Sequence, residues 1–318
     1  MNKISLILLI LIASSCASIK KTWNNANLFP VSEDIKLGEQ VYQEIISNTA
    51  EFPIVPESGN EEVYSYVRGI TKKILNTGNV KYATEFPWKV TLINDSKTQN
   101  AFATPGGYIF VYTGLMKFLD SEDQLAGVMG HEIAHAANRH STRQLTKIMG
   151  ASILLDAVLG KKETVKEVTT AIVGLSFSRD HETEADSFSV KYLCGTNYNA
   201  AGAAGFFKKI QGQATPPEWI STHPNPTNRV KNIESKAIAL SCRGKETYKA
   251  KYDQIKSLIN KIPPAPPAPK STLPKNQNTG SSGSTTKTGS DPMNKPTPPP
   301  STGTGSGKKT GGKIEKPN

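Results

Sequence analysis

The chain has 318 residues, enough for one sizeable folded domain with flanking segments. Apolar residues make up 36%, less than in an ordinary globular domain, and the formal net charge is +11. Eight lysines against two acidic residues put +6 of that charge into residues 262–318. The folded part is therefore only mildly basic, and nucleic acid is not expected as a partner.

The N-terminus has the features of an export signal. A short positive start precedes the apolar run Ile4–Ala13, which is too short to span a membrane permanently and predicts a signal peptide over residues 1–15. The small residues before Cys16 resemble a bacterial lipoprotein signal, in which the cysteine is lipidated and residues 16–30 form a linker from a membrane anchor. Ordinary secretion, with Cys16 incidental, is the alternative. Because Ala17 is not the Asp linked to inner-membrane retention, the resemblance implies the outer membrane, facing the periplasm.

The body, residues 31–261, is predicted to be mainly α-helical with a small β-sheet. Apolar residues recur at helical spacing through residues 31–75. Two β-rich segments, Trp88–Ile93 and Tyr108–Thr113, predict short strands, and the second follows a Pro-Gly-Gly turn. We expect Asn100–Thr113 to provide an edge strand beside the substrate cleft.

A second set of helices is predicted after the strands. Ser121 and Gln124 indicate a capping box that opens a helix, which should carry the HEIAH sequence and continue past His140. Further helical patterns cover residues 143–159, 163–176 and 180–194.

The end of the chain has a different composition. From residue 262 onward the sequence is rich in Pro, Ser, Thr, Gly and Lys and has almost no large apolar residue. Such a segment cannot bury enough apolar surface to offset its ordering entropy. We therefore predict a disordered tail over residues 262–318, starting with a stiff proline-rich stretch.

The sequence His131-Glu132-Ile133-Ala134-His135 is an HExxH motif. Side chains four residues apart lie on one face of a helix, so the two imidazoles can bind the same zinc ion. Glu132 lies between them, where a carboxylate can take a proton from a water at the metal. The alternative, two histidines on a solvated helix face, is disfavoured by the apolar residues around them.

A catalytic zinc site usually has a third protein ligand. Ser141 stands where a metzincin would have its third histidine, so that class is excluded. His140 should point about 140° away around the helix, as a surface or capping residue. Glu182 and Asp186 are four residues apart on the helix predicted over residues 180–194, so Glu182 can bind zinc while Asp186 accepts the N–H of a ligand imidazole. The alternative is an acidic solvated helix face, for which Glu184 is well suited.

These motifs together resemble the HtpX/BepA-like zinc metallopeptidases, gluzincins that also include the CAAX prenyl proteases. The resemblance extends over residues 31–260. The motifs that carry it are NAFATPGGYIFVYTGLM at 100–116, HEIAHAANRH at 131–140, SRDHETEAD at 178–186 and STHPNPTNR at 221–229.

The resemblance implies a zincin-like α+β fold and the third zinc ligand at Glu182. It further implies that His223 can approach the zinc as an extra ligand or latch, and that Arg229 stabilises the oxyanion. From the residues alone, a loop histidine held by Pro224 is the favoured interpretation of His223, and the resemblance reverses that preference. The periplasmic lipoprotein members are the most similar, because no transmembrane helix is predicted in the body.

The predicted function is a zinc-dependent endopeptidase, with one zinc ion per chain, that hydrolyses unfolded or misassembled envelope proteins. The first alternative is a chaperone-like periplasmic binding lipoprotein whose zinc is latched by His223 and rarely active. A purely structural zinc site is disfavoured, because structural zinc needs no base such as Glu132. The sequence does not indicate the oligomeric state.

Two cysteines remain after Cys16. In an exported protein a disulfide between Cys194 and Cys242 is the expected state, and two buried free thiols are the alternative.

Overall fold

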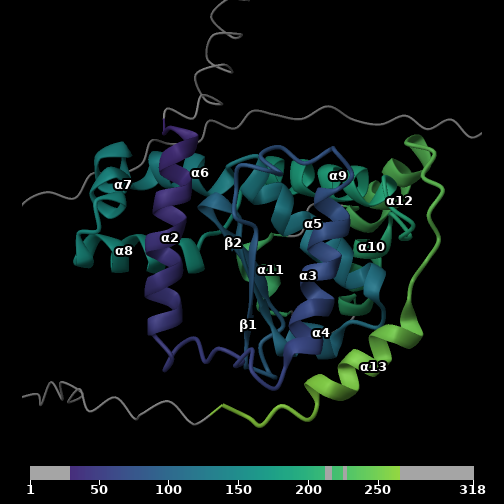
Figure 1. The fold of residues 1–318 in the computed structure, drawn as a ribbon. Coiled ribbons are helices and arrows are strands. Elements are labelled where there is room, and N and C mark those ends of the chain that lie inside the picture. The colour runs from purple at the N-terminus through teal and green to yellow at the C-terminus, as the bar shows by residue number, and fades with distance from the viewer. Residues whose placement is uncertain (1–28, 212–216, 225–227, 266–318) are drawn as a thin grey trace, which may run out of the picture. The chain divides into compact units, whose positions relative to one another are not determined.

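The computed structural model describes residues 29–211, 217–224 and 228–265 (Figure 1). The predicted signal peptide, the lipidation site Cys16 and nearly all of the predicted tail lie outside these residues. The start of the tail does not: Ile262 packs against the main core and the carbonyl oxygen of Pro263 accepts a hydrogen bond from Asn94.

The described residues form a mainly helical domain around one small sheet, which confirms the predicted fold class. The helices are α2 (Val31–Ser47), α3 (Glu61–Leu75), α4 (Thr113–Phe118), α5 (Glu122–Ala137), α6 (His140–Met149), α7 (Ala151–Val158), α8 (Lys162–Val173), α9 (Arg179–Cys194), α10 (Gly202–Ile210), α11 (Trp219–Thr222), α12 (Arg229–Ala239) and α13 (Lys249–Ile259). The strands are β1 (Lys89–Ile93), β2 (Ala101–Thr104) and β3 (Tyr108–Tyr112), with a 3-10 turn η1 (Pro105–Gly107) before β3.

The sheet has the order β1-β3-β2, so β3 is central and β2, within the predicted segment Asn100–Thr113, is an edge strand. Strand β1 is parallel to β3 and β2 is antiparallel to it. Both faces are buried, and alternate residues of β3 belong to two different apolar cores. This is the period of two expected for a strand covered on both sides.

The two cores lie on opposite faces of the sheet. The larger core joins the sheet to α3, α5, α9, α10 and α13. The smaller core joins the other face to α2, and α2 in turn packs against α7 and α8 (Figure 1). Helices α7 and α8 therefore form an outer layer that α2 separates from the sheet, while α6 joins this layer to α5.

Helix α5, which carries the HExxH motif, is packed very closely by its neighbours. A Cβ atom at Gly127 would lie 2.3 Å from the backbone nitrogen of Ala203 on α10, and one at Gly130 would lie 2.8 Å from Ser189 Oγ on α9. Only glycine permits such close approach. The packing holds α9, and with it Glu182, directly against the motif.

Three local predictions were wrong. Residues 31–75 form two helices, α2 and α3, separated by residues 48–60. Helix α5 begins after Ser121 as predicted, but not through a capping box: the Ser121 hydroxyl donates to Asp123, and the Gln124 side chain accepts from the backbone N–H of Asp120. The predicted pattern over 143–159 is divided at Gly150, which has φ = 87°.

The HExxH helix also does not continue past His140. It ends at Ala137, and Arg139 has a left-handed conformation (φ = 58°) before α6 begins. The Arg139 guanidinium binds the buried carboxylate of Asp34 on α2 and the carbonyl oxygen of Phe29. These tertiary contacts offset the strain of the left-handed residue, which the helical period alone could not show.

Cys194, at the end of α9, and Cys242, after α12, form a disulfide with an S–S distance of 2.04 Å. The bond closes a loop with a sequence separation of 48 residues, which contains α10, α11 and α12. No helix among the described residues is long and apolar enough to cross a membrane.

Candidate metal centre

Four buried side chains meet where α5, α9 and α11 converge: His131, His135, Glu182 and His223, called here the ligand cluster. One donor atom from each lies within 4.8 Å of all the others, and none of the four residues is more than 1% exposed. The Nε2 atoms of His131 and His135 are 2.9 Å apart, and His135 Nε2 is 3.3 Å from Glu182 Oε1. The structure thus brings together the three predicted ligands and the predicted latch residue.

The fold brings Glu182 to the motif through the start of α9. Ser178 caps this helix by accepting a hydrogen bond from the His181 backbone N–H at 3.2 Å, so Glu182 lies near the positive end of the helix dipole. His223 caps the C-terminal end of the short helix α11. Its Nδ1 is 3.1 Å from Glu182 Oε1 and 3.3 Å from His131 Nε2.

Each of the two motif imidazoles on α5 has a hydrogen-bond partner at its Nδ1 atom. His131 Nδ1 lies 2.8 Å from Asp186 Oδ1, the contact expected for Asp186. His135 Nδ1 lies 3.0 Å from Nδ1 of His140, whose Nε2 is 3.1 Å from Glu184 Oε2. The prediction that His140 is a surface or capping residue was wrong, because the break at Arg139 turns this residue back toward the motif.

These contacts assign the tautomers of the two motif histidines. A carboxylate only accepts hydrogen bonds, so Nε2 of His140 donates to Glu184. Burial lowers the pKa of His140, so the ring is neutral at neutral pH and its Nδ1 accepts the N–H of His135 Nδ1. Asp186 likewise accepts from His131 Nδ1. Both rings then present Nε2, the usual atom for a metal, to the ligand cluster.

Glu132 faces the same site and is 1% exposed. Its Oε1 accepts a hydrogen bond from Trp219 Nε1 at 3.2 Å and lies 3.6 Å from His223 Nε2. The Trp219 ring stacks on His223 with centroids 4.2 Å apart, and Phe177 lies 4.0 Å from the His135 ring. In this conformation aromatic side chains cover the base and the ligand cluster.

Arg229 is buried on the other side of the cluster. Its Nη2 donates to Asp186 Oδ1 at 2.7 Å, and its Nη1 is 3.1 Å from Glu182 Oε2. The guanidinium lies over the rings of both Phe207 and Trp219, at 4.1 and 4.8 Å from their centroids. Arg229 is therefore occupied by carboxylates in this conformation, not directed at an open oxyanion position.

The electrostatics of the cluster follow from burial and charge. Burial raises the pKa of Glu132, although His223 and His131 oppose the shift. Burial works to lower the pKa of His131, but the Glu182 charge and the Asp186 hydrogen bond outweigh it and raise the pKa to about 9. Burial lowers the pKa of His135 well below its usual value. Below about pH 9 the raised pKa favours a charged His131, whose Nε2–H can donate to His135 Nε2 at 2.9 Å.

The donor set fits one zinc ion per chain. Two imidazoles and a carboxylate from two helices are the protein ligands of a thermolysin-type zinc enzyme, and His223 can supply a fourth donor. The buried Glu182 carboxylate lies 3.5 Å from His131 Nε2 and 3.3 Å from His135 Nε2, so a positive charge between these atoms is favoured.

Comparison with known families agrees with this geometry. Residues 62–237 match the family described as peptidase family M48. The chain belongs to peptidase family M48. This confirms the resemblance to the HtpX/BepA-like zinc metallopeptidases, and with it zinc as the metal of the site.

Two groups of M48 relatives are similar to the chain. It is 28% identical over 190 residues to the beta-barrel assembly-enhancing protease of Escherichia coli strain K12, which covers 54% of this chain and 38% of that protein. It is 26% identical over 209 residues to the mitochondrial metalloendopeptidase OMA1 of Schizosaccharomyces pombe, covering 63% of this chain and 59% of the relative. The chain therefore spans between about two fifths and three fifths of the length of these relatives.

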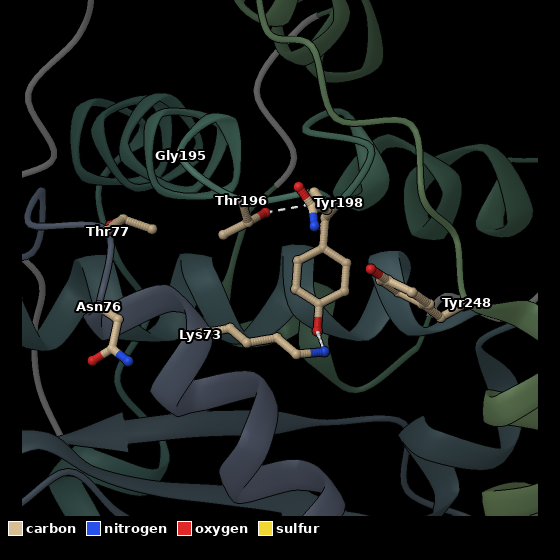
Figure 2. A pocket seen from close by; sticks show the side chains of 8 residues that line it. Lys73, Asn76, Thr77, Gly195, Thr196, Tyr198 and Tyr248 are labelled. Carbon is tan, nitrogen blue, oxygen red and sulfur yellow. Dashed lines mark hydrogen bonds between the residues drawn. The ribbon is translucent and has the colours of Figure 1, made fainter.

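A cavity of about 380 Å³ lies away from the M48 ligand cluster (Figure 2). Figure 2 shows Lys73 turned toward the Tyr198 hydroxyl, to which it donates at 3.1 Å. Lys73 also forms an ion pair with the buried Glu122 at 2.9 Å. None of the residues that line this cavity belongs to the ligand cluster.

The sequence did not identify three residues of the M48 site: His140 as the partner of His135, and Trp219 and Phe177 as its aromatic cover. A signal for His140 was present, because it is one of only five histidines and lies close to the motif. Trp219 and Phe177 had no signal, because an aromatic residue in a loop is usually part of the core.

Proposed function

We propose that this M48 protein is a zinc-dependent endopeptidase that hydrolyses unfolded or misassembled envelope proteins. The observation that supports it most strongly is the position of Glu132: a buried base beside two imidazoles and a carboxylate that fit zinc. A zinc ion held there supplies a Lewis acid for the scissile carbonyl and makes a water acidic enough to ionise near neutral pH.

Glu132 acts as the general base in this proposal. Burial raises the pKa of Glu132 toward neutral pH, and a base with such a pKa can both take up and release a proton efficiently. Glu132 takes the proton of the attacking water and delivers it to the leaving amine. Both steps require the Trp219 hydrogen bond to Glu132 Oε1 to be released or lengthened.

Arg229 and Asp186 position the ligands. The Arg229 guanidinium contacts Asp186 and Glu182, so it offsets the charge of two buried carboxylates. When substrate enters, either Arg229 or His223 can turn a donor toward the carbonyl oxygen and stabilise the oxyanion.

The edge strand β2 offers a binding mode for extended polypeptides. Among the described residues it pairs only with β3, and it packs against α5, so this edge strand runs beside the motif helix. The Trp219 backbone N–H donates to the Gln99 carbonyl, just before β2, at 3.3 Å. Displacement of α11 would thus free this edge for a substrate strand, which pairs through its backbone and favours unfolded chains over one sequence.

The closed site favours one alternative, a chaperone-like binding lipoprotein with a latched, rarely active zinc. His223 is one of the four residues of the ligand cluster, and Trp219 donates a hydrogen bond to the base Glu132. The resting state is therefore expected to be inactive. In either version Cys16 is lipidated and anchors the protein in the outer membrane of a bacterial envelope, facing the periplasm. The E. coli relative's name, which refers to beta-barrel assembly, supports a substrate among envelope proteins.

Cleavage assays separate these possibilities. The zinc-loaded protein should cleave β-casein and an unfolded outer-membrane barrel protein, stop on chelation and recover on addition of zinc. The matched control is Glu132→Gln. Stable binding of both substrates without cleavage, in wild type and in His223→Ala, would establish the chaperone-like alternative.

The latch itself is tested by His223→Ala. A latch predicts faster cleavage of unfolded substrates, because an inhibitory donor is gone. A transition-state role predicts slower cleavage with zinc retained. Unchanged cleavage and unchanged zinc affinity would leave His223 as a structural loop residue.

A further inference from the structure

The outer layer of the domain exposes apolar side chains that its fold does not use. Among the described residues, five large apolar side chains are exposed, and three of them lie in α6, in α7 and directly after α7: Ile148 at 65%, Leu155 at 43% and Leu159 at 76%. The other two, Ile238 and Leu240, lie at the end of α12. The fold therefore concentrates exposed apolar surface within residues 148–159.

Helix α7 carries apolar side chains both on the face that it buries and on the face that it exposes. Leu154 and Ala157 are buried in the smaller core with Leu37 and Val41 of α2. Leu155 and Leu159 are four residues apart, so they share a face, and that face is turned to solvent. Figure 1 shows α7 on the side of α2 away from the sheet, at the border of the domain.

The charges around this surface have one predominant sign. Residues 148–160 contain a single charged residue, Asp156, which pairs with Lys161 at 2.8 Å. Lys147 and Lys162 are exposed at either end of this stretch. Three lysines against Asp156 give residues 147–162 a net charge of +2. An apolar face flanked by lysines is the pattern of a helix that lies in a membrane interface.

The chain enters the described domain at Phe29, close to α6 and α7, which supports a membrane on the same side of the domain as these helices. The carbonyl oxygen of Phe29 accepts a hydrogen bond from Arg139, the residue before α6, and Phe29 lies in the same core as Leu154. Cys16 is thirteen residues before Phe29, a reach of at most about 45 Å. A lipid on Cys16 would therefore hold the α6–α7 surface near the same membrane.

We infer that the exposed side chains of Ile148, Leu155 and Leu159, with Lys147 and Lys162 at the two ends of the same stretch, together form a docking site for an anionic lipid surface. A single lipid chain binds reversibly, and a second contact with apolar and basic groups makes attachment stable. The stretch 148–160 is too short to span the membrane, so the helix lies in the interface. The contact would orient the domain above the membrane through the layer that joins α5 to α9 in sequence.

The test uses the mature chain from Ala17 to Asn318, which lacks the leader and the lipidated cysteine. It is sedimented with vesicles of phosphatidylethanolamine and phosphatidylglycerol, and with vesicles of phosphatidylcholine alone. The apolar variant replaces Ile148, Leu155 and Leu159 by Gln. The matched control is Ile238→Gln, which removes an apolar side chain that is 78% exposed on α12.

We expect the wild type to bind the anionic vesicles, and the apolar variant to bind at least about tenfold more weakly, since even partial burial of three such side chains exceeds that factor. Ile238→Gln should bind as the wild type does. Lys147→Gln with Lys162→Gln should weaken binding to anionic vesicles only, and added salt should do the same. Because all five positions are exposed, thermal unfolding and zinc content should be unchanged.

Any of four results would overturn the inference. Absence of wild-type binding to anionic vesicles, or equal binding by the apolar variant, would exclude this surface as a lipid contact. Concentration-dependent self-association that the apolar variant abolishes would show that a second copy covers the surface. If the apolar variant lost casein binding while its vesicle binding was unchanged, the surface would instead be assigned to polypeptide substrates.

Discussion

His140 gives the sharpest test of how the site is built. In His140→Ala the His135 ring loses its partner at Nδ1, and a cavity forms where a fully buried imidazole lay 3.0 Å away. His135 would then be free to rotate or to exchange tautomers, so that Nε2 no longer faces the ligand cluster. Glu184, which is exposed enough to be solvated, loses only one hydrogen bond.

The expected loss of zinc affinity in His140→Ala follows from the role of a residue that hydrogen-bonds to a metal-ligating histidine. Loss of the group behind a metal-ligating histidine typically weakens metal binding by about 10–100-fold, or roughly 1.4–2.7 kcal/mol. We expect His140→Ala to fall in that range. Glu184→Gln should lie at or below its lower end, because the amide can still accept the hydrogen bond from His140.

The assay is competition for zinc with a chromogenic chelator, which reads affinity without reference to activity. The matched control is His181→Ala, because His181 stacks on His140 at 4.4 Å with an angle of 9° but does not contact His135 through a hydrogen bond. Its zinc affinity should stay within about threefold of wild type. Equal affinities for His140→Ala and wild type would refute the reasoning, and equal losses in both variants would show a general packing defect.

Three further predictions concern the base, the protons and the disulfide. Glu132→Gln should lower kcat by about 10²–10⁴-fold with zinc retained, and rapid turnover in this variant would remove Glu132 from its role. With its pKa near 9, His131 is protonated in the metal-free protein below that pH, so zinc affinity should fall as pH decreases and calorimetry in different buffers should show proton release. Zinc binding without proton uptake by the buffer would contradict this. Cys194→Ala with Cys242→Ala should lower the free energy of unfolding by up to about 4 kcal/mol for a separation of 48 residues, measured by urea titration. An unchanged midpoint would show that the loop is already ordered in the unfolded chain.

The sequence by itself determined the chemistry of the site. HExxH needs only the helical period to bring two imidazoles and a base together, because all three are within one turn of one helix. Glu182 and Asp186 are likewise four residues apart, so the helical period places them on one face of α9. The pairing of these two helices could be predicted only through resemblance to a family, since nothing in either segment specifies the other.

Only the tertiary structure decided what surrounds those residues. His140 turns back to His135 because Asp34, more than a hundred residues away in sequence, holds Arg139 in a left-handed conformation. Trp219 reaches Glu132 because it packs in the larger core against Phe206 and Phe207 of α10. Contacts of this kind depend on packing between distant segments, and a local period carries no information about them. For the same reason the sequence suggested apolar helices after the motif, but only the fold revealed which of their faces remains exposed.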